Sequence, residues 1–258
     1  MRINKNTVGF TMSEVLITIG IIGVVAAMTL PSVIWNIKHK QLETAFKKAY
    51  SKHSEALMLV KAEAGIDNLY TEFKVYNANS GYYRKNEFIN MYMSKLNKIG
   101  KCKYKKPIRN YNNTADAYID IGGTANTKYL LGDGSCMNLQ INSGTVGITI
   151  DTNGAGGGPN RLGHDVFTFH VNRQGIWEPV KMTKLYTDEE LEALRNKYLS
   201  QSENGKLTGG QEATVQQNGF PCSIKSKQKG NGMGCTWYAF NDINPEDNKS
   251  RYWENLPH

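Results

Sequence analysis

The stretch Val8–Trp35, VGFTMSEVLITIGIIGVVAAMTLPSVIW, decides the architecture of this 258-residue chain. Between Val15 and Trp35 it contains 21 residues without a single charged side chain. As an α-helix at 1.5 Å per residue, these span roughly 31 Å, which is enough to cross the hydrocarbon core of a bilayer at about 30 Å. The sequence therefore predicts a membrane-spanning helix close to the N-terminus.

One carboxylate stands at the entrance of this apolar run. Glu14 directly precedes Val15, and an unpaired charge at such a place costs several kcal/mol in lipid. The residue therefore requires a positively charged partner. A new α-amino group, made by cutting the chain just before Phe10, would supply one at close range.

The residues around this charge resemble a known processing site. Gly9-Phe10-Thr11-x-x-Glu14 ahead of an apolar helix is similar to the cleavage and methylation site of type IV pilins and type II secretion pseudopilins. The resemblance implies that a prepilin peptidase cuts between Gly9 and Phe10 and methylates the Phe10 amine. It gives Glu14 the role of setting subunit registry in a filament. Pro31 matches the helix-kinking proline of the family, because proline lacks the N–H that a helix interior needs.

Two other interpretations of the N-terminus stay open, a simple membrane anchor and a removed secretory signal peptide. A signal peptide has an apolar core of about 7–15 residues, a small-residue cleavage site beyond it and no acidic residue at its start. Ala26-Ala27 matches such a cleavage site poorly, and Glu14 does not belong in one. We therefore favour the prepilin-type site.

The processing site divides the chain into parts with different surroundings. Residues 1–9 form a basic leader, residues 10–64 a long helix of which 15–35 cross the membrane, and residues 65–258 a globular head. Basic residues favour the cytoplasmic side of a membrane. We expect a single-pass protein of the inner (cytoplasmic) membrane with an extracytoplasmic head, and a filament after assembly.

The helix is predicted to continue beyond the membrane as an amphipathic segment. From Lys38 to Ala64, apolar side chains recur at helical spacing and lysines lie on the other side. Gly65 is placed to end the helix, since glycine adopts the left-handed conformation common after a last helical turn. The apolar positions are Leu42, Ala45, Phe46, Ala49, Tyr50, Ala56, Leu57 and Val60.

Five short segments within residues 117–171 alternate in polarity and are rich in β-branched or aromatic residues. They are AYIDI, KYLL, CMNLQI, TVGITID and DVFTFHV. We expect an antiparallel sheet of four or five strands whose apolar face is covered by the stripe of the long helix. The predicted fold class is α+β, and a long helix on an antiparallel sheet is also the pilin fold that the resemblance implies.

Short helices and a terminal hairpin are expected around this sheet. Residues 87–98 and 187–199 are predicted helices, the second opened by a Thr-x-x-Glu capping-box pattern. Residues 200–218 are polar, and we expect a loop or an insertion there. The tail favours a hairpin whose last strand is Thr236–Phe240.

All four cysteines follow the apolar run. An even count in an exported region favours two disulfides. Four cysteines allow three pairings, of which we favour Cys102–Cys136 and Cys222–Cys235 because each joins neighbours in sequence. A zinc site is the rival interpretation, but no C-x-x-C spacing and no neighbouring histidine support it.

A glycine-rich loop, DTNGAGGGPNRLGHD at residues 151–165, lies between two predicted strands. Asp151, Asn153 and Asp165 would offer oxygen ligands to calcium, although the loop does not follow the EF-hand template. It also resembles a Gly- and Pro-Asn-containing loop of pseudopilins, some of which bind calcium. The alternative is structural, with glycine and asparagine supplying positive φ and aspartate capping turns.

The chain carries a formal net charge of +8, and seven basic residues lie in the stretch Lys95–Arg109. Such a stretch attracts the phosphates of DNA or lipid. A solvated basic face is the other interpretation, so nucleic acid is kept only as an alternative partner.

No nucleophile motif, zinc-protease motif, dinucleotide fingerprint or phosphate loop occurs in the sequence, and we predict that the chain is not an enzyme. The resemblance implies a pseudopilin or minor pilin of a type IV pilus or a type II secretion pseudopilus. Its partners would be the prepilin peptidase, other pilin or pseudopilin subunits, the inner-membrane assembly platform and the lipid bilayer. The alternative is a membrane-anchored extracytoplasmic protein whose head binds DNA, surfaces or secreted substrates.

Overall fold

The structure is a computed structural model that describes residues 11–73, 85–119, 128–142, 145–202 and 204–257. The chain divides into two compact units, Met1–Gln41 and Leu42–His258. The first contains the apolar part of the long helix, and the second contains the sheet and the remaining helices.

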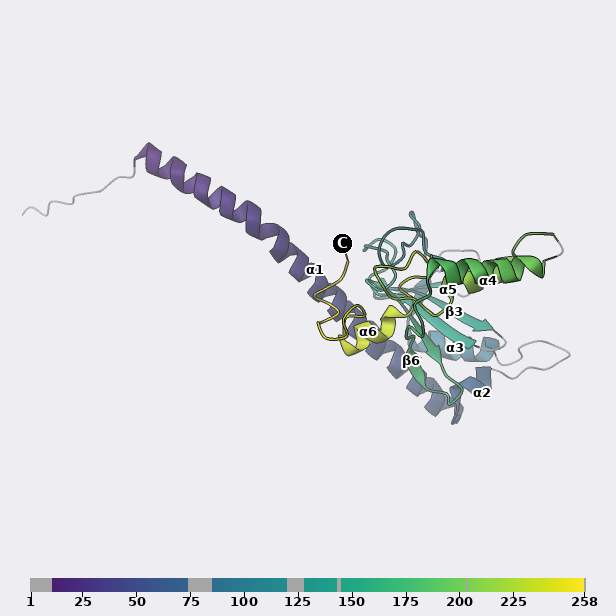
Figure 1. The fold of residues 1–258 in the computed structure, drawn as a ribbon. Helices are drawn as coiled ribbons and strands as arrows, with labels where there is room; N and C mark the ends of the chain where they lie inside the picture. The colour runs from purple at the N-terminus through teal and green to yellow at the C-terminus, as the bar shows by residue number, and fades with distance from the viewer. Residues whose placement is uncertain (1–10, 74–84, 120–127, 143–144, 203, 258) are drawn as a thin grey trace, which may run out of the picture. The chain divides into compact units, whose positions relative to one another are not determined.

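Helix α1 (Met12–Ala64) is 53 residues long (Figure 1). It continues through Pro31, where the predicted bend stays a prediction. The residue after its last turn is Gly65, whose φ is +61°. The predicted end of the helix is therefore confirmed, and it depends on the freedom of glycine to adopt a left-handed conformation.

The second unit contains a six-stranded antiparallel sheet in the order β1-β2-β3-β4-β5-β6. Each strand therefore pairs with its neighbour in sequence, as in a meander. This arrangement confirms the α+β class. The strands are β1 (Lys98–Gly100), β2 (Lys128–Leu131), β3 (Cys136–Asn142), β4 (Thr145–Asp151), β5 (Val166–Val171) and β6 (Trp177–Pro179).

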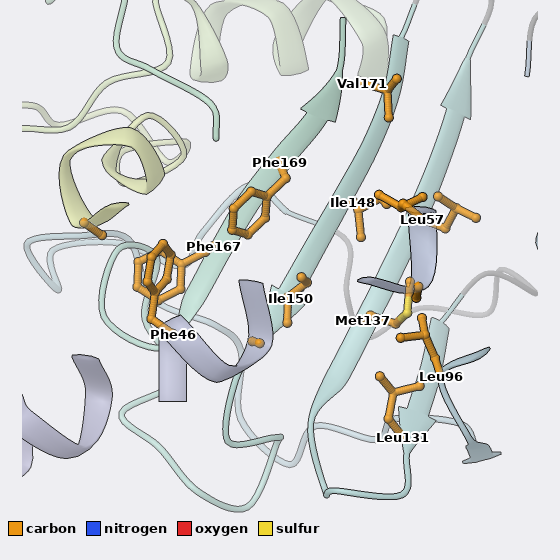
Figure 2. Close-up of a cluster of buried hydrophobic side chains, with 14 of the residues drawn as sticks. Phe46, Leu57, Leu96, Leu131, Met137, Ile148, Ile150, Phe167, Phe169 and Val171 are labelled. Carbon is orange, nitrogen blue, oxygen red and sulfur yellow. The ribbon is translucent and has the colours of Figure 1, made fainter. Parts of the chain in front are cut away.

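The apolar stripe of α1 packs on this sheet. Phe46 is only 2% exposed, and its ring centroid lies 4.5 Å from that of Phe167 and 6.1 Å from that of Phe169. Leu57 belongs to the same buried cluster as Ile148 (Figure 2). The predicted packing of helix on sheet is therefore confirmed, and burial of these rings is the main source of its stability.

Shorter helices follow in the described part of the chain. They are α2 (Leu69–Phe73), α3 (Lys85–Lys95), α4 (Asp188–Ser200), α5 (Gly209–Gln217) and α6 (Cys235–Asn241). The predicted helix 187–199 corresponds to α4. The predicted helix 87–98 corresponds to α3, which ends at Lys95, while Lys98 begins β1. The capping box that opens α4 is present with both of its bonds.

One prediction for the C-terminal region is wrong, and another is wrong in one of its alternatives. Thr236–Phe240, predicted as the last strand of a hairpin, lies in α6. Residues 200–218, predicted as a loop or an insertion, contain α5 and are therefore not simply a loop. The strand prediction followed from aromatic and β-branched residues, whose preference depends on context. Cys235 and Ala239 are buried while Phe240 is exposed. Residues four apart share one face of a helix, so this burial pattern suits a helix.

The sheet extends past the predicted strands at both edges. β1 and β6 are three residues long each, too short for alternation to be visible in the sequence. In the predicted strand AYIDI, residues 120 and 121 lie outside the described residues, and 117–119 are in no strand.

Candidate functional site

The predicted processing site lies just ahead of α1. Gly9 and Phe10 lie outside the described residues, so cleavage and methylation at this site stay predictions. Thr11 and Glu14 are described, and Glu14 lies in the first turn of α1.

Thr11 and Glu14 cap the N-terminus of α1 reciprocally. Glu14 Oε2 accepts hydrogen bonds from the Thr11 backbone N–H at 2.8 Å and from Thr11 Oγ1 at 2.8 Å. In return, the Glu14 backbone N–H donates to Thr11 Oγ1 at 3.2 Å. This is a capping box, which satisfies N–H groups that the first turn of a helix cannot pair internally. The cap was not predicted, although Thr-x-x-Glu ahead of an apolar run is its sequence pattern.

The cap determines how the carboxylate is presented. Both bonds from Thr11 go to Oε2 of Glu14, and no side chain or backbone group of the described residues donates to Oε1. Glu14 is exposed. Its Oε1 can therefore accept a hydrogen bond from a cationic group of another chain while the cap persists.

The hydroxyl groups in the apolar run are satisfied within the helix. Thr18 Oγ1 donates to the Glu14 carbonyl oxygen at 2.6 Å. Thr29 Oγ1 donates to the Val25 carbonyl oxygen at 2.9 Å, and Ser32 Oγ to the Thr29 carbonyl oxygen at 2.9 Å. Hydroxyls bonded in this way need no water, so they do not prevent the helix from entering hydrocarbon.

Within the described residues, α1 is the helix that is long and apolar enough to cross a membrane. Its most apolar 18-residue window has a mean hydropathy of 2.2, and none of that window is buried. Leu16, Ile22 and Met28 are among its exposed side chains. An apolar surface of this extent is costly in water and marks a membrane or partner contact. The helix has the length and the surface of a single membrane anchor.

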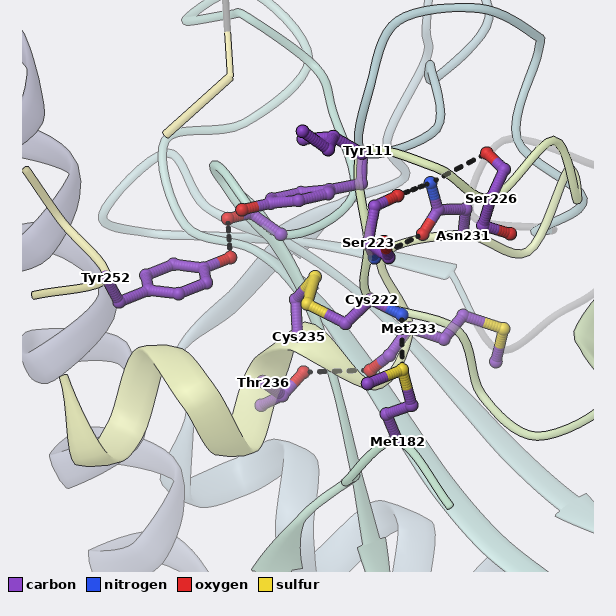
Figure 3. Close-up of a disulfide and its surroundings, with 12 residues drawn as sticks. Tyr111, Met182, Cys222, Ser223, Ser226, Asn231, Met233, Cys235, Thr236 and Tyr252 are labelled. Carbon is purple, nitrogen blue, oxygen red and sulfur yellow. Dashed lines mark hydrogen bonds between the residues drawn. A yellow bond between two sulfur atoms is a disulfide. The ribbon is translucent and has the colours of Figure 1, made fainter. Parts of the chain in front are cut away.

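The structure pairs the cysteines as Cys102–Cys136 and Cys222–Cys235, with Cα–Cα distances of 5.9 Å and 4.9 Å. This agrees with the favoured pairing. The first bond joins the chain after β1 to the start of β3. The second joins a loop to the first residue of α6 (Figure 3). Each disulfide ties irregular chain to an element of the core.

Asp151 and Asp165 lie at the two ends of the glycine-rich loop and anchor its turns. Asp151 Oδ1 accepts from the Gly154 backbone N–H at 2.8 Å. Asp165 accepts from the backbone N–H groups of Asn160 and Arg161, each at 2.8 Å. These bonds match the turn-capping interpretation of the loop.

Both carboxyl groups are buried, which disfavours their charged forms. Burial raises the pKa of Asp165 to about 7, and the nearby charge of Asp151 adds to the rise. Burial also raises the pKa of Asp151, although Tyr104 Oη, which donates to it at 2.6 Å, opposes the rise. Because two interacting acids resist ionising together, this loop should respond to pH.

The side chains of this loop offer the oxygen donors that calcium prefers, but fewer of them than calcium takes. Asp151, Asn153 and Asp165 carry oxygen donors, and Asn153 Oδ1 is buried without a hydrogen-bond partner. In the described residues, no three His, Cys, Asp or Glu side chains form a group that could hold a metal. Calcium takes about six to eight oxygen ligands, so the others would be amide and backbone oxygens. Calcium binding stays a prediction.

The basic stretch Lys95–Arg109 alternates between inward and outward side chains at its centre. Cys102 is buried in its disulfide, and the hydroxyl of Tyr104 is bonded to a buried carboxylate. The lysine at the start of the stretch and the arginine at its end are each paired with an acidic side chain. The exposed lysines between them are Lys98, Lys101, Lys103, Lys105 and Lys106.

Comparison of the chain with models of protein families, with curated proteins and with solved structures found no match. The function must therefore be inferred from the residues of the chain itself.

Proposed function

We propose that this chain is a pilin-like subunit, a pseudopilin or minor pilin, which a prepilin peptidase cuts between Gly9 and Phe10 and methylates at Phe10. The subunit would be stored in the inner membrane. An assembly platform would then add it to other subunits in a type IV pilus or a type II secretion pseudopilus. The observation that carries the proposal is Glu14 at the start of an unburied apolar helix whose C-terminal part belongs to the core of an α+β head.

The unburied surface of α1 suits both stages of this proposal. Lipid tails would cover it during storage, and the helices of neighbouring subunits would cover it in the filament. In a plain membrane anchor Glu14 would serve only as a helix cap, and its charge beside the apolar run would add a cost in lipid. In the filament, its Oε1 would accept a hydrogen bond from the methylated Phe10 amine of a neighbouring subunit.

An ion pair between Glu14 and this amine would be removed from water by the packed helices. Taking away one partner of such a pair costs about 3–5 kcal/mol, because the other charge is left uncompensated. The loss would recur at every subunit of the filament. We therefore expect Glu14→Ala to insert into the membrane and to be processed, but not to assemble.

The test combines intact mass with filament yield. Membrane-extracted protein should lose residues 1–9 and gain one methyl group only when a prepilin peptidase is co-expressed. Filaments are then counted for the wild type, Glu14→Ala and the control Ser13→Ala, an exposed neighbour on the same turn. We expect all three to be processed and only Glu14→Ala to lack filaments. Normal filaments from Glu14→Ala would remove the registry role, and an uncut chain would remove the prepilin assignment.

A second candidate function, a membrane-anchored binding protein, is supported by the exposed lysines of residues 101–106. Their ammonium groups would contact the phosphates of DNA. Replacing these four lysines by glutamine in the full-length chain should then abolish DNA binding and its salt dependence. Unchanged affinity would reject this candidate. Neither candidate involves catalysis by this chain.

A further inference from the structure

A pocket of about 490 Å³ opens at the edge of the sheet, where β6, the chain after it and α6 meet. Small-molecule sites have volumes of about 300–1,000 Å³. α6 is held at this edge by a hydrogen bond from the Trp237 N–H to the Val180 carbonyl oxygen at 3.0 Å. The pocket belongs to the head alone and uses none of the residues assigned to assembly.

Aromatic side chains line this pocket. Phe220 and Phe240 are 39% and 43% exposed, although large aromatic side chains are mostly buried in folded proteins. Trp237, half-buried, lies one helical turn before Phe240 in α6, so both face the same side of that helix. The head therefore presents aromatic surface to solvent in one concave place.

Phe220 is held in a backbone conformation that bulky residues avoid. Its φ is +49°, within the left-handed region. The adjacent Gly219 carbonyl oxygen accepts from the Thr183 N–H at 2.8 Å, and Cys222 is joined to Cys235 of α6 (Figure 3). Residues kept in such conformations are concentrated at ligand-binding sites. The backbone that carries the ring is therefore fixed before any ligand arrives.

Besides Pro179 and Val180, the rest of the lining is made of polar side chains, with one carboxylate and one ammonium group among them. His170 Nε2 and Glu178 Oε1 lie 2.9 Å apart. Lys181 Nζ lies 3.8 Å from the centroid of the Trp237 ring and covers one face of it. Asn241 Nδ2 donates to the Trp237 carbonyl oxygen at 2.8 Å, which leaves its carboxamide oxygen to accept. One carboxylate and one ammonium group favour neither an anion nor a cation as ligand.

We propose that this pocket binds an uncharged saccharide unit. A pyranose ring has an apolar C–H face, which fits the exposed rings of Phe220 and Phe240. Its hydroxyl groups donate to a carboxylate such as Glu178 and accept from an ammonium group such as Lys181. A purely apolar ligand would desolvate these polar groups without replacing their hydrogen bonds. A ligand with both surfaces is therefore the better match.

The test is binding of defined glycans by the full-length chain in lipid nanodiscs, because detergents with sugar head groups would compete. The probes are maltotetraose, cellotetraose and tetra-N-acetylchitotetraose, all uncharged. Binding is measured by saturation-transfer NMR and by tryptophan fluorescence. Phe220→Gly is the main variant, since glycine adopts a φ of +49° without strain and removes the ring. Phe240→Ala is the second. Ile224→Ala, an exposed apolar residue outside the pocket, is the control.

We expect at least one glycan to bind the wild type and Ile224→Ala equally well. Its affinity should fall about tenfold in Phe220→Gly through loss of the ring contact, while the thermal midpoint of this variant stays equal or rises. Unchanged affinity in both phenylalanine variants, or no binding of any of the three glycans, would overturn the proposal. Binding of the peptide acetyl-Ala-Phe-Ala-amide in place of the glycans would overturn it as well, since the pocket would then dock peptides.

Discussion

The apolar segment Val15–Trp35 and the head from Leu42 onward are stabilised by different surroundings. None of the apolar window of α1 is buried, whereas Phe46 of the same helix is 2% exposed. The first region needs lipid or neighbouring helices to cover it. The second has its own core, its own sheet and two disulfides.

In a chain that assembles as proposed, this difference separates assembly from folding. Substitutions in the apolar segment should change insertion or subunit packing and leave the free energy of unfolding of the head unchanged. Substitutions in the core of the head should do the reverse. Under the proposed function, one helix would therefore serve assembly and folding through separate segments, and each could be altered alone.

The largest effect is expected from Phe46→Ala. Its ring contacts Phe167, Phe169 and Trp253, so removing it should lower the free energy of unfolding of the head by about 3–5 kcal/mol. Chemical denaturation of the full-length chain in nanodiscs, followed by near-ultraviolet circular dichroism, measures this. Ile22→Ala, on the exposed apolar surface, should change that free energy by less than about 0.5 kcal/mol. Equal costs for the two substitutions would show that the apolar segment and the head do not depend on different surroundings.

The disulfides should have the next largest effect, confined to the head. In the loop-entropy model, the bond across 34 residues stabilises by about 3.8 kcal/mol and the bond across 13 residues by about 2.9 kcal/mol. Replacing Cys102 and Cys136 together by serine should therefore cost more than replacing Cys222 and Cys235. The same denaturation experiment ranks the two double variants. The opposite order would show that local packing outweighs loop length.

The two regions also differ in how far the sequence predicts them. The apolar run, the amphipathic stripe and the stop at Gly65 are local patterns, and each matches α1. β2 to β5 are long enough for alternation to be visible. α6 was missed because its residues are typical of a strand, while its helical form follows from contacts with distant chain, such as the hydrogen bond of Trp237 to Val180.

The candidate sites differ in the same way, because local patterns can be predicted from the sequence and contacts with distant chain cannot. Glu14 could be singled out from the sequence because a charge beside an apolar run is costly in lipid. Its cap by Thr11 was equally local and was overlooked. Phe220 could not be predicted as a pocket residue, because its left-handed backbone depends on contacts with residues distant in the chain. The Thr183 N–H donates to the neighbouring Gly219 carbonyl oxygen, and the Phe220 carbonyl oxygen lies against Gly234.

A pH dependence of stability should occur in the head and should depend on Asp165. Its pKa is raised from 3.8 to about 7 by burial, so the folded chain keeps a proton that the unfolded chain releases in this window. Stability should therefore fall as pH rises from about 4 to about 7. The fall should be on the order of 2 kcal/mol, less than the full shift, because Asp151 competes for the proton.

Denaturation midpoints of the wild type and Asp165→Asn, measured across this pH window, check the prediction. The midpoint of the wild type should fall as pH rises while that of Asp165→Asn stays nearly constant, so the stability of the wild type relative to the variant should decrease across this window. Parallel curves would show that Asp165 keeps its ordinary ionisation in the fold.

The smallest effect is expected from removing a capping box, a motif that occurs in both regions. Thr11 with Glu14 and Thr187 with Glu190 form capping boxes of similar geometry. Replacing the threonine by alanine should cost each helix end about 1 kcal/mol. Amide exchange should accelerate in the first turn of α4 for Thr187→Ala and in the first turn of α1 for Thr11→Ala.

The control for this pair is the free energy of unfolding of the head. Thr187→Ala should lower it measurably, because α4 belongs to the head. Thr11→Ala should leave it unchanged and, under the proposed function, reduce filament yield modestly, because the cap holds the Glu14 carboxylate through Oε2. If Thr11→Ala destabilised the head as much as Thr187→Ala does, the two parts of α1 would be one cooperative unit, and assembly and folding could not be altered separately.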